Sequence, residues 1–418
     1  MSGENYRIAL LLRTQCAHSR ETLRGIIDAV WYGGTSAGRP SRNYRPLLPW
    51  TFKLFSQLEH TGVDSLFREI SHFAPHGMIF ETFGDDMYAR IGEVRCPGVE
   101  VFQVSRTASL YASVNTDHLM IGRLAAEYLT ELGLRHFAFF GGSQYTYSQR
   151  RLEGFQDCLR NPPKSRLQMG QPRQEAQVFD RCLPGWQALI ESWLKNLPRP
   201  VGIFAANDLF ATEILQELIK TGWRIPEDAA VLGVDDDELQ CNLAYPPISS
   251  IQPGFRQVGR AAARMLEQLL KGEEVAAAVS VPPLRVVARY STDITHVDNE
   301  FVAEALRCIR GSPLTNLSVK VLLNRIPTNR RRLERAFVET LGRTPMEEIH
   351  RVRVLKIKEL LMAGKSIEQT AREMHFSSPK YMTTLFRRIT GLTPSEYQAE
   401  LQNPLMNADR RSKKVPRQ

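Results

Sequence analysis

The sequence lacks the cysteine pattern of a zinc site or of a disulfide scaffold. Its six cysteines are scattered over 418 residues, with no CxxC pair and no paired spacing to the nine histidines. Scattered single cysteines are typical of a reducing compartment, where most of them are buried as small apolar side chains. We therefore expect no bound metal, no cofactor and no disulfide framework.

Long apolar runs are missing as well. The longest run near the N-terminus, Ile8 to Leu12, is closed by Arg13, and it is too short for the core of a signal peptide or for a membrane span. This predicts a cytoplasmic protein without membrane contact.

Catalytic motifs occur only in unsuitable places. A GxSxG pattern stands at residues 34–38, but it follows a predicted helix, whereas serine hydrolases need a turn from strand to helix. Residues 364–366 end like a phosphate-binding loop, yet a predicted helix precedes them too. No catalytic base stands at a telling spacing from either motif, so we predict no catalytic residues.

Charge is unevenly distributed. From Asn299 to the C-terminus, 23 Lys and Arg stand against 12 Asp and Glu, a net charge of +11, whereas the preceding part has 31 against 33, a net charge of −2. A near-neutral body followed by a basic region is the electrostatic pattern of a nucleic-acid-binding domain. A basic membrane-surface module would have a similar charge, but the cationic helices here alternate with turns and have no broad aromatic face.

The basic region contains an internal repeat. Leu317 to Ile349 and Lys365 to Tyr397 each comprise a short predicted helix, a turn, a second helix and a closing Gly-x-Thr-Pro. Apolar residues four positions apart place a core on one face of each second helix and leave the other face polar. The sequence therefore predicts two helix-turn-helix units.

The polar faces of the second helices are predicted to bind DNA. Asn329 caps the first of these helices and Ser378 caps the other. Short polar and cationic side chains at the start of a recognition helix suit the major groove. A lone arginine run would be interpreted as a solvated helix face, but two runs at equivalent places in a repeat favour DNA contact. The predicted DNA-binding residues are Asn329, Arg330, Arg331, Arg332, Ser378, Lys380, Thr383, Thr384, Arg387 and Arg388.

Residues 299–400 resemble the DNA-binding domain of the AraC/XylS family of transcription regulators, in which a long helix joins two helix-turn-helix units. The joining helix is expected from Met346 to Met362. The family usually has glycine in each turn, whereas this chain has Pro327 and His375. Histidine tolerates a left-handed backbone better than most residues and proline cannot adopt one, so the first turn must differ in detail.

The part before residue 294 alternates apolar runs with helical segments. This alternation predicts a doubly wound parallel sheet that binds ligands beyond the carboxyl ends of its strands. About 290 residues is too long for one such sheet, so two lobes are expected. A final strand is expected within Val281 to Asp293. The other apolar runs are Tyr6 to Arg13, Gly77 to Glu81, Glu100 to Val104, His136 to Phe140, Val201 to Ala205 and Ala230 to Val234.

Polar residues follow several of these predicted strands. The arrangement resembles the sugar-binding domain of the LacI/GalR regulators and of type I periplasmic binding proteins, where acids, an asparagine and an arginine close on sugar hydroxyls between two lobes. Carboxylates and a guanidinium discriminate a hydroxyl, because they are left unpaired when it is missing. The candidates that the resemblance implies are Asp117, Arg151, Asn207 and Asp235, with Asp208 and Asp236 beside them.

Two of these assignments have plainer alternatives. The acids from Asp235 to Glu238 could simply cap the next helix. Trp186 could stack on the apolar face of a pyranose, although a buried tryptophan is more often part of a core. We keep Trp186 as a candidate ligand-binding residue.

The order of domains resembles the xylose operon regulatory proteins, a family in which a LacI-like sugar domain precedes an AraC-like DNA-binding domain. The segments VLGVDDDEL (231–239) and VPPLRVVARYSTD (281–293) carry this resemblance. It implies a two-lobed sensor at residues 6–293, an all-α domain with two helix-turn-helix motifs at 294–400, and a basic tail at 401–418.

The resemblance implies a homodimeric transcription activator with three further partners, namely operator DNA, a monosaccharide with D-xylose as first candidate, and RNA polymerase. Two alternatives stay open at this point. One is an enzyme that acts on a sugar in the two-lobed body, and the other is a regulator of the same architecture with another effector.

Overall fold

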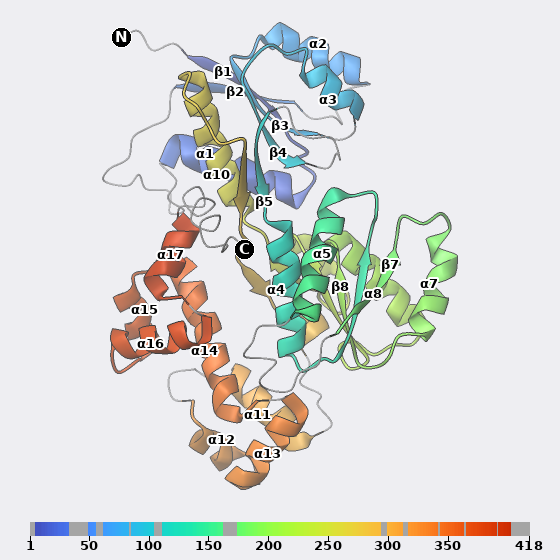
Figure 1. The fold of residues 1–418 in the computed structure, drawn as a ribbon, viewed down its shortest axis with the longest axis vertical. Helices are drawn as coiled ribbons and strands as arrows, with labels where there is room; N and C mark the ends of the chain where they lie inside the picture. The colour runs from blue at the N-terminus through green and yellow to red at the C-terminus, as the bar shows by residue number, and fades with distance from the viewer. Residues whose placement is uncertain are drawn as a thin grey trace, which may run out of the picture.

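The chain folds into two α/β lobes followed by a helical domain (Figure 1). The computed structural model describes residues 5–32, 49–55, 62–82, 85–103, 111–161, 174–293, 299–311, 317–341, 343–362, 365–390 and 392–402. Lobe 1 lies at the top of Figure 1 and lobe 2 at the right, with the helical domain at the bottom and left. The predicted fold class, a two-lobed sensor before a double helix-turn-helix domain, is confirmed.

Lobe 1 is a parallel sheet in the order β11-β5-β4-β3-β1-β2. Alternate residues of its central strand β1 enter two different cores, with Ile8 and Leu10 on one face and Ala9 and Leu11 on the other, because side chains alternate along a strand. Helices α1 and α10 cover the first face, and α2 and α3 cover the second. The elements are β1 (Tyr6–Leu11), α1 (Ala17–Tyr32), β2 (Trp50–Phe55), α2 (Val63–Phe73), β3 (Gly77–Thr82), α3 (Asp85–Ile91), β4 (Gly98–Gln103), β5 (Ala112–Thr116), α10 (Phe255–Leu270) and β11 (Ala278–Val281).

Lobe 2 has the sheet order β12-β10-β9-β8-β6-β7, parallel except for β12, which is antiparallel to β10. Its large core lies between the sheet and helices that include α4, α5 and α8. The elements are α4 (His118–Glu131), β6 (His136–Gly141), α5 (Thr146–Arg160), β7 (Ala176–Asp180), α7 (Trp186–Lys195), β8 (Val201–Ala205), α8 (Asp208–Lys220), β9 (Ala229–Val234), α9 (Glu238–Leu243), β10 (Ser249–Gln252) and β12 (Arg285–Val287).

The six predicted apolar runs form β1, β3, β4, β6, β8 and β9, which confirms that part of the prediction. The strands β2, β5, β7, β10 and β11 were missed, because each contains polar residues and none is a continuous apolar run.

The chain passes between the lobes three times, from β5 to α4, from β10 to α10 and from β11 to β12. The last passage contains β12 (Arg285–Val287), which confirms the prediction of a final strand within Val281 to Asp293. Val281 ends β11 in lobe 1, β12 lies in lobe 2, and the short helix η2 (Tyr290–Thr292) follows. Proline has no N–H to donate to a ladder, so Pro282 and Pro283 separate the two strands.

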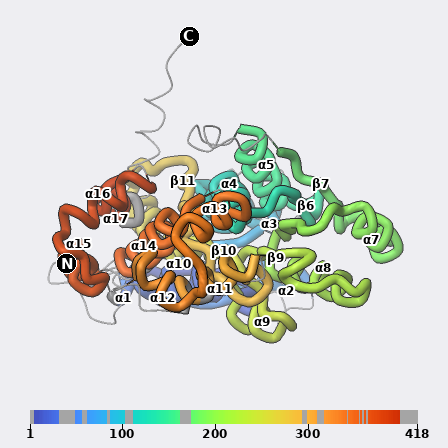
Figure 2. The backbone as a smooth tube through the Cα atoms, turned by 90° about the horizontal axis from the view of Figure 1, so that it is seen from below, coloured from blue at the N-terminus to red at the C-terminus, as the bar shows by residue number. Residues whose placement is uncertain are grey.

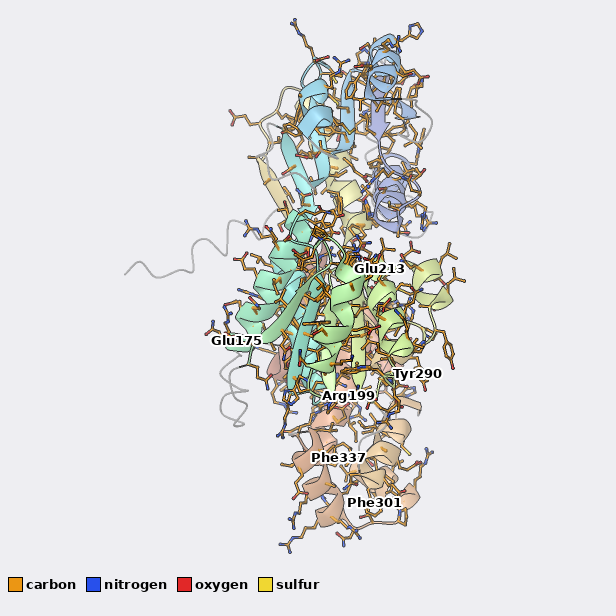
Figure 3. The ribbon with its side chains drawn as sticks, turned by 90° about the vertical axis from the view of Figure 1, so that its right-hand side faces the viewer. Glu175, Arg199, Glu213, Tyr290, Phe301 and Phe337 are labelled. Atoms are coloured by element: carbon orange, nitrogen blue, oxygen red, sulfur yellow. The ribbon has the colours of Figure 1, made fainter. Side chains whose placement is uncertain are left out.

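The helical domain has two units, each with its own core. Phe337 lies in the first core and Phe386 in the second, and both are fully buried. Figure 3 shows Phe301 and Phe337 in the first unit, at the end of the molecule opposite lobe 1. Helix α14 joins the two units (Figures 1 and 2). The elements are α11 (Glu300–Gly311), α12 (Val319–Arg325), α13 (Arg330–Leu341), α14 (Pro345–Met362), α15 (Ile367–Glu373), α16 (Pro379–Thr390) and α17 (Pro394–Gln402).

Several predicted features fall outside the described residues, namely the GxSxG pattern at 34–38 and the tail beyond residue 402. Ser366, the last residue of the other dismissed motif, caps α15 in a capping box with Gln369. Within the part of the chain that the structure describes, no helix is both long and apolar enough to cross a bilayer.

Candidate ligand cleft and nucleic-acid interface

A cavity of about 510 Å³ lies between the two lobes. Its walls are built where strands end, after β1 and at the end of β4 in lobe 1, and after β8 and β9 in lobe 2, together with the first turns of α1 and α5. This is where a doubly wound fold binds its ligands. The lining residues are Arg13, Gln15, Cys16, Ala17, His18, Phe102, Tyr145, Tyr147, Arg151, Asn207, Asp208, Leu209, Phe210, Asp235, Asp237 and Gln240.

Arg151 is the central cation of the cleft and is only 1% exposed. It projects from α5, lies over the ring of Tyr147 at 5.0 Å from the centroid, and donates a hydrogen bond to the carbonyl of Ala206. Its Nη2 lies 3.6 Å from Oδ1 of Asp235, which is an ion-pair distance but too long for a hydrogen bond. Burial lowers the pKa of Arg151, and the charge of Asp235 opposes that effect. Burial raises the pKa of Asp235, and the charge of Arg151 opposes that effect. The hydrogen-bonding groups of the pair are incompletely satisfied.

Asn207 and Asp208 follow β8 and hold lobe 2 together at the cleft. Asn207 accepts a hydrogen bond from the N–H of Phe210, which caps α8, and donates one to the hydroxyl of Tyr147. Asp208 accepts hydrogen bonds from the Ser250 hydroxyl at 2.6 Å and from the N–H of Asp237 at 2.9 Å. Burial, and next the charge of Asp235, raises the pKa of Asp208 well above its usual range. Asp208 therefore lines the cleft and also connects β8 to β10 and to the start of α9.

The acids that follow β9 have different partners. Asp235 faces Arg151 in the cleft, whereas Asp237 caps α9 by accepting hydrogen bonds from the N–H groups of Leu239 and Gln240. The sequence allowed two interpretations of this acidic run. Asp235 is placed as a ligand-binding residue would be, and Asp237 is a helix cap. Asp235 and Asp236 have positive φ angles of 115° and 51°. Such conformations are costly for residues other than glycine, and they gather at functional sites.

Three of the predicted ligand-binding residues lie outside the lining of this cavity. Asp117 accepts the N–H of Met120 and caps α4. Asp236 turns away and pairs with Arg289 at 2.8 Å. Trp186 packs against Phe140 in lobe 2, with ring centroids 5.7 Å apart. Asp117 is thus held by a helix cap, Asp236 by an ion pair, and Trp186 by aromatic packing, which is the alternative that the sequence left open for it.

Five aromatic residues that line the cleft were not predicted from the sequence, namely His18, Phe102, Tyr145, Tyr147 and Phe210. The His18 ring stacks on Phe102 at 4.2 Å, and Phe102 lies 5.9 Å from Tyr147 across the lobes. Phe102 stands at the end of β4 with a φ of 57°, so the rule that ligands meet strand ends could have found it. Tyr147 precedes Arg151 by one helical turn, and that spacing is the signal that could have revealed it.

The second helices of the two helical units expose the predicted DNA-binding residues. Asn329 caps α13 through the N–H of Arg332, and Ser378 caps α16 through the N–H of Tyr381, as predicted. Thr383 and Ser378 are half-buried. The other predicted DNA-binding residues are exposed, namely Asn329, Arg330, Arg331, Arg332, Lys380, Thr384, Arg387 and Arg388.

Some of these cations have partners within the domain. Arg330 pairs with Glu334 one turn later at 2.8 Å, and the Arg332 guanidinium lies 4.7 Å from the ring centroid of Phe301. An exposed pair of this kind stabilises a helix by only about 0.2–0.5 kcal/mol, so a phosphate can replace the carboxylate at little cost. In the second unit, Arg388 lies 3.0 Å from Nδ1 of His350 on the joining helix.

Comparison with known proteins agrees with this division. Residues 126–292 match the model of a periplasmic binding protein-like domain, and residues 322–400 match the model of a helix-turn-helix domain. The chain is 29% identical to the xylose operon regulatory protein of Haemophilus influenzae, over 95% of this chain and 99% of that protein. It is also 29% identical to the xylose operon regulatory protein of Escherichia coli K12, over 79% and 85%.

A solved structure of a xylose-binding transcription activator is similar along the same length. It has 25% sequence identity and a TM-score of 0.56, and the match covers 95% of this chain and 99% of that one. The chain thus joins a periplasmic binding protein-like domain to a helix-turn-helix domain, and it is similar along nearly its whole length to the xylose operon regulatory proteins. It is therefore a sugar-responsive DNA-binding transcription regulator, and the alternative of a sugar-processing enzyme is excluded because these relatives regulate transcription.

Proposed function

We propose that this regulator responds to D-xylose and activates transcription. The cavity between the lobes is the effector site, and residues 6–293 and 294–400 are the sensor and the DNA-binding domain. The relatives that match along nearly the whole chain support the sugar and the sign of regulation, since they include xylose operon regulatory proteins and a xylose-binding activator.

The observation that carries the proposal is the set of buried polar atoms at the Arg151–Asp235 pair. Among the described residues, Nε and Nη2 of Arg151 and Oδ1 of Asp235 are buried without a hydrogen-bond partner. Leaving such atoms unpaired costs roughly 1–3 kcal/mol each. A sugar hydroxyl donates and accepts at once, so it satisfies both sides of the pair. Because the two charges offset each other, the cleft suits an uncharged ligand.

The aromatic rings complete this site. Phe102 comes from lobe 1 and Tyr147 from lobe 2, and their rings lie 5.9 Å apart in the cleft wall, so a sugar bound beside them contacts both lobes. We infer that the sugar binds the closed form better than the open form, and that this differential affinity shifts the population towards a DNA-competent homodimer. In that state Arg330 and its neighbours on α13, and Lys380 and its neighbours on α16, bind operator DNA, and the cytoplasmic activator contacts RNA polymerase.

A thermal-shift screen tests the effector. The protein is heated with D-xylose, L-arabinose, D-ribose and D-glucose at several concentrations. Because a ligand that binds only the folded state raises the melting temperature in proportion to the logarithm of its concentration, D-xylose is expected to give the largest shift. A larger shift with another sugar would identify a regulator of the same architecture with a different effector.

The variant Asp235→Asn tests the site. It removes the acceptor charge opposite Arg151, so affinity for D-xylose should fall by at least about tenfold, while DNA binding without sugar stays nearly unchanged. Glu175→Gln is the matched control, since Glu175 is an exposed acid of lobe 2 that pairs with Arg160 on the outer surface (Figure 3). Unchanged affinity in titrations of intrinsic fluorescence would remove Asp235 from the site.

A further inference from the structure

A buried ionic cluster lies at the start of α14, where the DNA-binding domain meets the sensor. Glu348 is fully buried and accepts hydrogen bonds from Arg343 at 2.6 Å and from Arg351 at 2.8 and 2.9 Å. Two guanidinium groups around one carboxylate leave an excess of positive charge in a buried place. An excess charge of this kind needs a further acid nearby.

The further acid comes from the sensor. Nη1 of Arg351 donates to Oε2 of Glu131 at 3.3 Å, and Glu131 is the last residue of α4. Two residues later, Gly133 has a φ of 90°, and a Cβ at this position would lie 3.2 Å from Cδ2 of Leu341 and 3.4 Å from the carbonyl oxygen of Thr340. The end of α4 thus makes both a charged and a close packing contact with the first helix-turn-helix unit. Figures 1 and 2 both show this unit next to lobe 2.

The other end of α4 reaches the ligand cleft. His118 is its first residue, and the centroid of its ring lies 6.2 Å from that of Tyr147 in the cleft wall. Fourteen residues of α-helix span about 21 Å, so one rigid element connects the cleft to the DNA-binding domain.

Helix α5, which carries Tyr147 and Arg151, is locked against α4. A Cβ on Gly122 of α4 would lie 2.0 Å from the carbonyl oxygen of Arg151, and a Cβ on Gly154 of α5 would lie 2.0 Å from that of Leu119. Backbones this close leave no room for one helix to move without the other. A displacement of Arg151 by a ligand therefore displaces α4 as well.

We propose that α4 and α5 form the element that carries the ligand state of the cleft to the DNA-binding domain, and that the Glu131–Arg351 contact is its joint. This inference rests on the proposed function. Closure of the cleft on a sugar shifts the end of α4 and thereby changes the contact between Glu131 and Arg351. The two ligand states thus hold the first helix-turn-helix unit differently, which is the differential contact that allosteric coupling requires.

The test measures coupling rather than affinity. A duplex is first selected from a random-sequence pool by binding to the wild-type protein. Its dissociation constant is then measured without and with saturating D-xylose, and the ratio of the two values is the coupling ratio. Allosteric coupling is typically about 5- to 150-fold, so the wild-type ratio should lie in this range.

The variant Glu131→Gln removes the sensor-side charge and leaves the Glu348 cluster intact. Glu131 is partly exposed, with 37% of its side chain accessible, so the variant should fold normally. Its coupling ratio is expected to fall at least threefold towards one, and Glu131→Arg, which places a cation against Arg351, should lower it further. The control Glu153→Gln removes an exposed acid of α5 that pairs with Arg150, and it should keep the wild-type ratio.

Reciprocity adds a second readout, because DNA must change the affinity for D-xylose by the same factor by which D-xylose changes the affinity for DNA. If Glu131→Gln and Glu131→Arg both keep the wild-type ratio, the joint is overturned while the proposed function stands. If the wild-type ratio is one although D-xylose binds, both proposals fail.

Discussion

The two helix-turn-helix units close with the same local structure. Thr344 begins α14 by exchanging hydrogen bonds with Glu347, and Thr393 begins α17 by exchanging the same bonds with Glu396. This reciprocal arrangement satisfies N–H groups that a helix start otherwise leaves free. The internal repeat therefore extends beyond the second helices into the helices that follow them.

The two units differ at the next residue. The first copy has Glu348, which is buried among arginines and tied through Arg351 to the sensor. The second has Tyr397, whose ring packs on Phe386 inside the core of its own unit, with centroids 5.6 Å apart. At this position of the repeat, one unit has a core contact and the other has a buried acid that holds Arg351, the residue that contacts the sensor. At this position the first unit is therefore stabilised by a contact with the sensor, whereas the second unit is stabilised by packing within its own core.

The turns of the two units also differ, as the sequence predicted. In the second turn His375 is left-handed, with a φ of 51°. In the first, Ile326 ends α12 in an extended conformation with a φ of −106°, and Pro327 follows. Two different backbones thus place α13 and α16.

The largest expected effects test whether the two cores are equivalent. Phe337→Ala and Phe386→Ala remove fully buried rings from matched positions, so each should cost its unit about 3–5 kcal/mol of unfolding free energy. Hydrogen exchange of the two units separately measures these costs. A much smaller cost for Phe386→Ala would mean that the second core is loosely packed, contrary to its description as self-contained.

The next effect concerns the buried acid of the first unit. Burial raises the pKa of Glu348, but Arg351 and Arg343 outweigh burial and hold it at about 2, below its usual 4.5. A depressed pKa means that the stabilisation is complete above pH 4.5 and is lost as the pH falls towards 2. By this shift it amounts to roughly 3 kcal/mol, so Glu348→Gln should destabilise the protein by about that much at pH 7.

Urea denaturation of wild type and Glu348→Gln between pH 7 and pH 3 measures this stabilisation. The gap between the two proteins should narrow as the pH falls. Glu396→Gln, which changes an acid of the second unit's capping box, serves as the control and should cost about 1 kcal/mol or less. A gap that stays constant with pH would show that Glu348 is not held as a carboxylate by its arginines.

A smaller effect separates base reading from phosphate contact. Arg330→Ala should cost about 1–3 kcal/mol of DNA-binding free energy and relax specificity at one position, if the first unit reads bases. Lys380→Ala should weaken all duplexes uniformly and reduce the dependence of binding on salt. Binding to a set of single-base variants of the selected duplex distinguishes the two patterns. A uniform loss for Arg330→Ala would assign the base reading elsewhere.

The smallest effects have opposite signs in the two turns. His375→Gly relieves a left-handed side chain and should stabilise the second unit by about 0.5–1 kcal/mol. Pro327→Gly adds freedom to the unfolded chain and should destabilise the first unit by a similar amount. Thermal unfolding of both variants measures these changes in stability. If both variants were stabilised, or both destabilised, the two turns would be less different than their backbones indicate.

The sequence by itself determined those elements whose signals are local. The apolar runs set the six strands that it predicted, and the capping residues Asn329 and Ser378 set the starts of α13 and α16. These features depend on neighbours within a few residues, which a sequence displays directly. The presence of Arg151 and Asp235 at the cleft was also foreseeable, because the fold class brings the carboxyl ends of the strands and the helices that follow them to one edge.

Only the tertiary structure decided what lies between the lobes and between the domains. Asp117, Asp236 and Trp186 stood next to plausible positions, yet each side chain is held elsewhere by a cap, an arginine or an aromatic neighbour. Arg351 and Glu131 are separated by 220 residues of chain, and no local pattern links them. Contacts of this kind arise when helices and strands that are distant in the sequence pack together. The contact between the sensor and the DNA-binding domain can therefore be identified only in the folded protein.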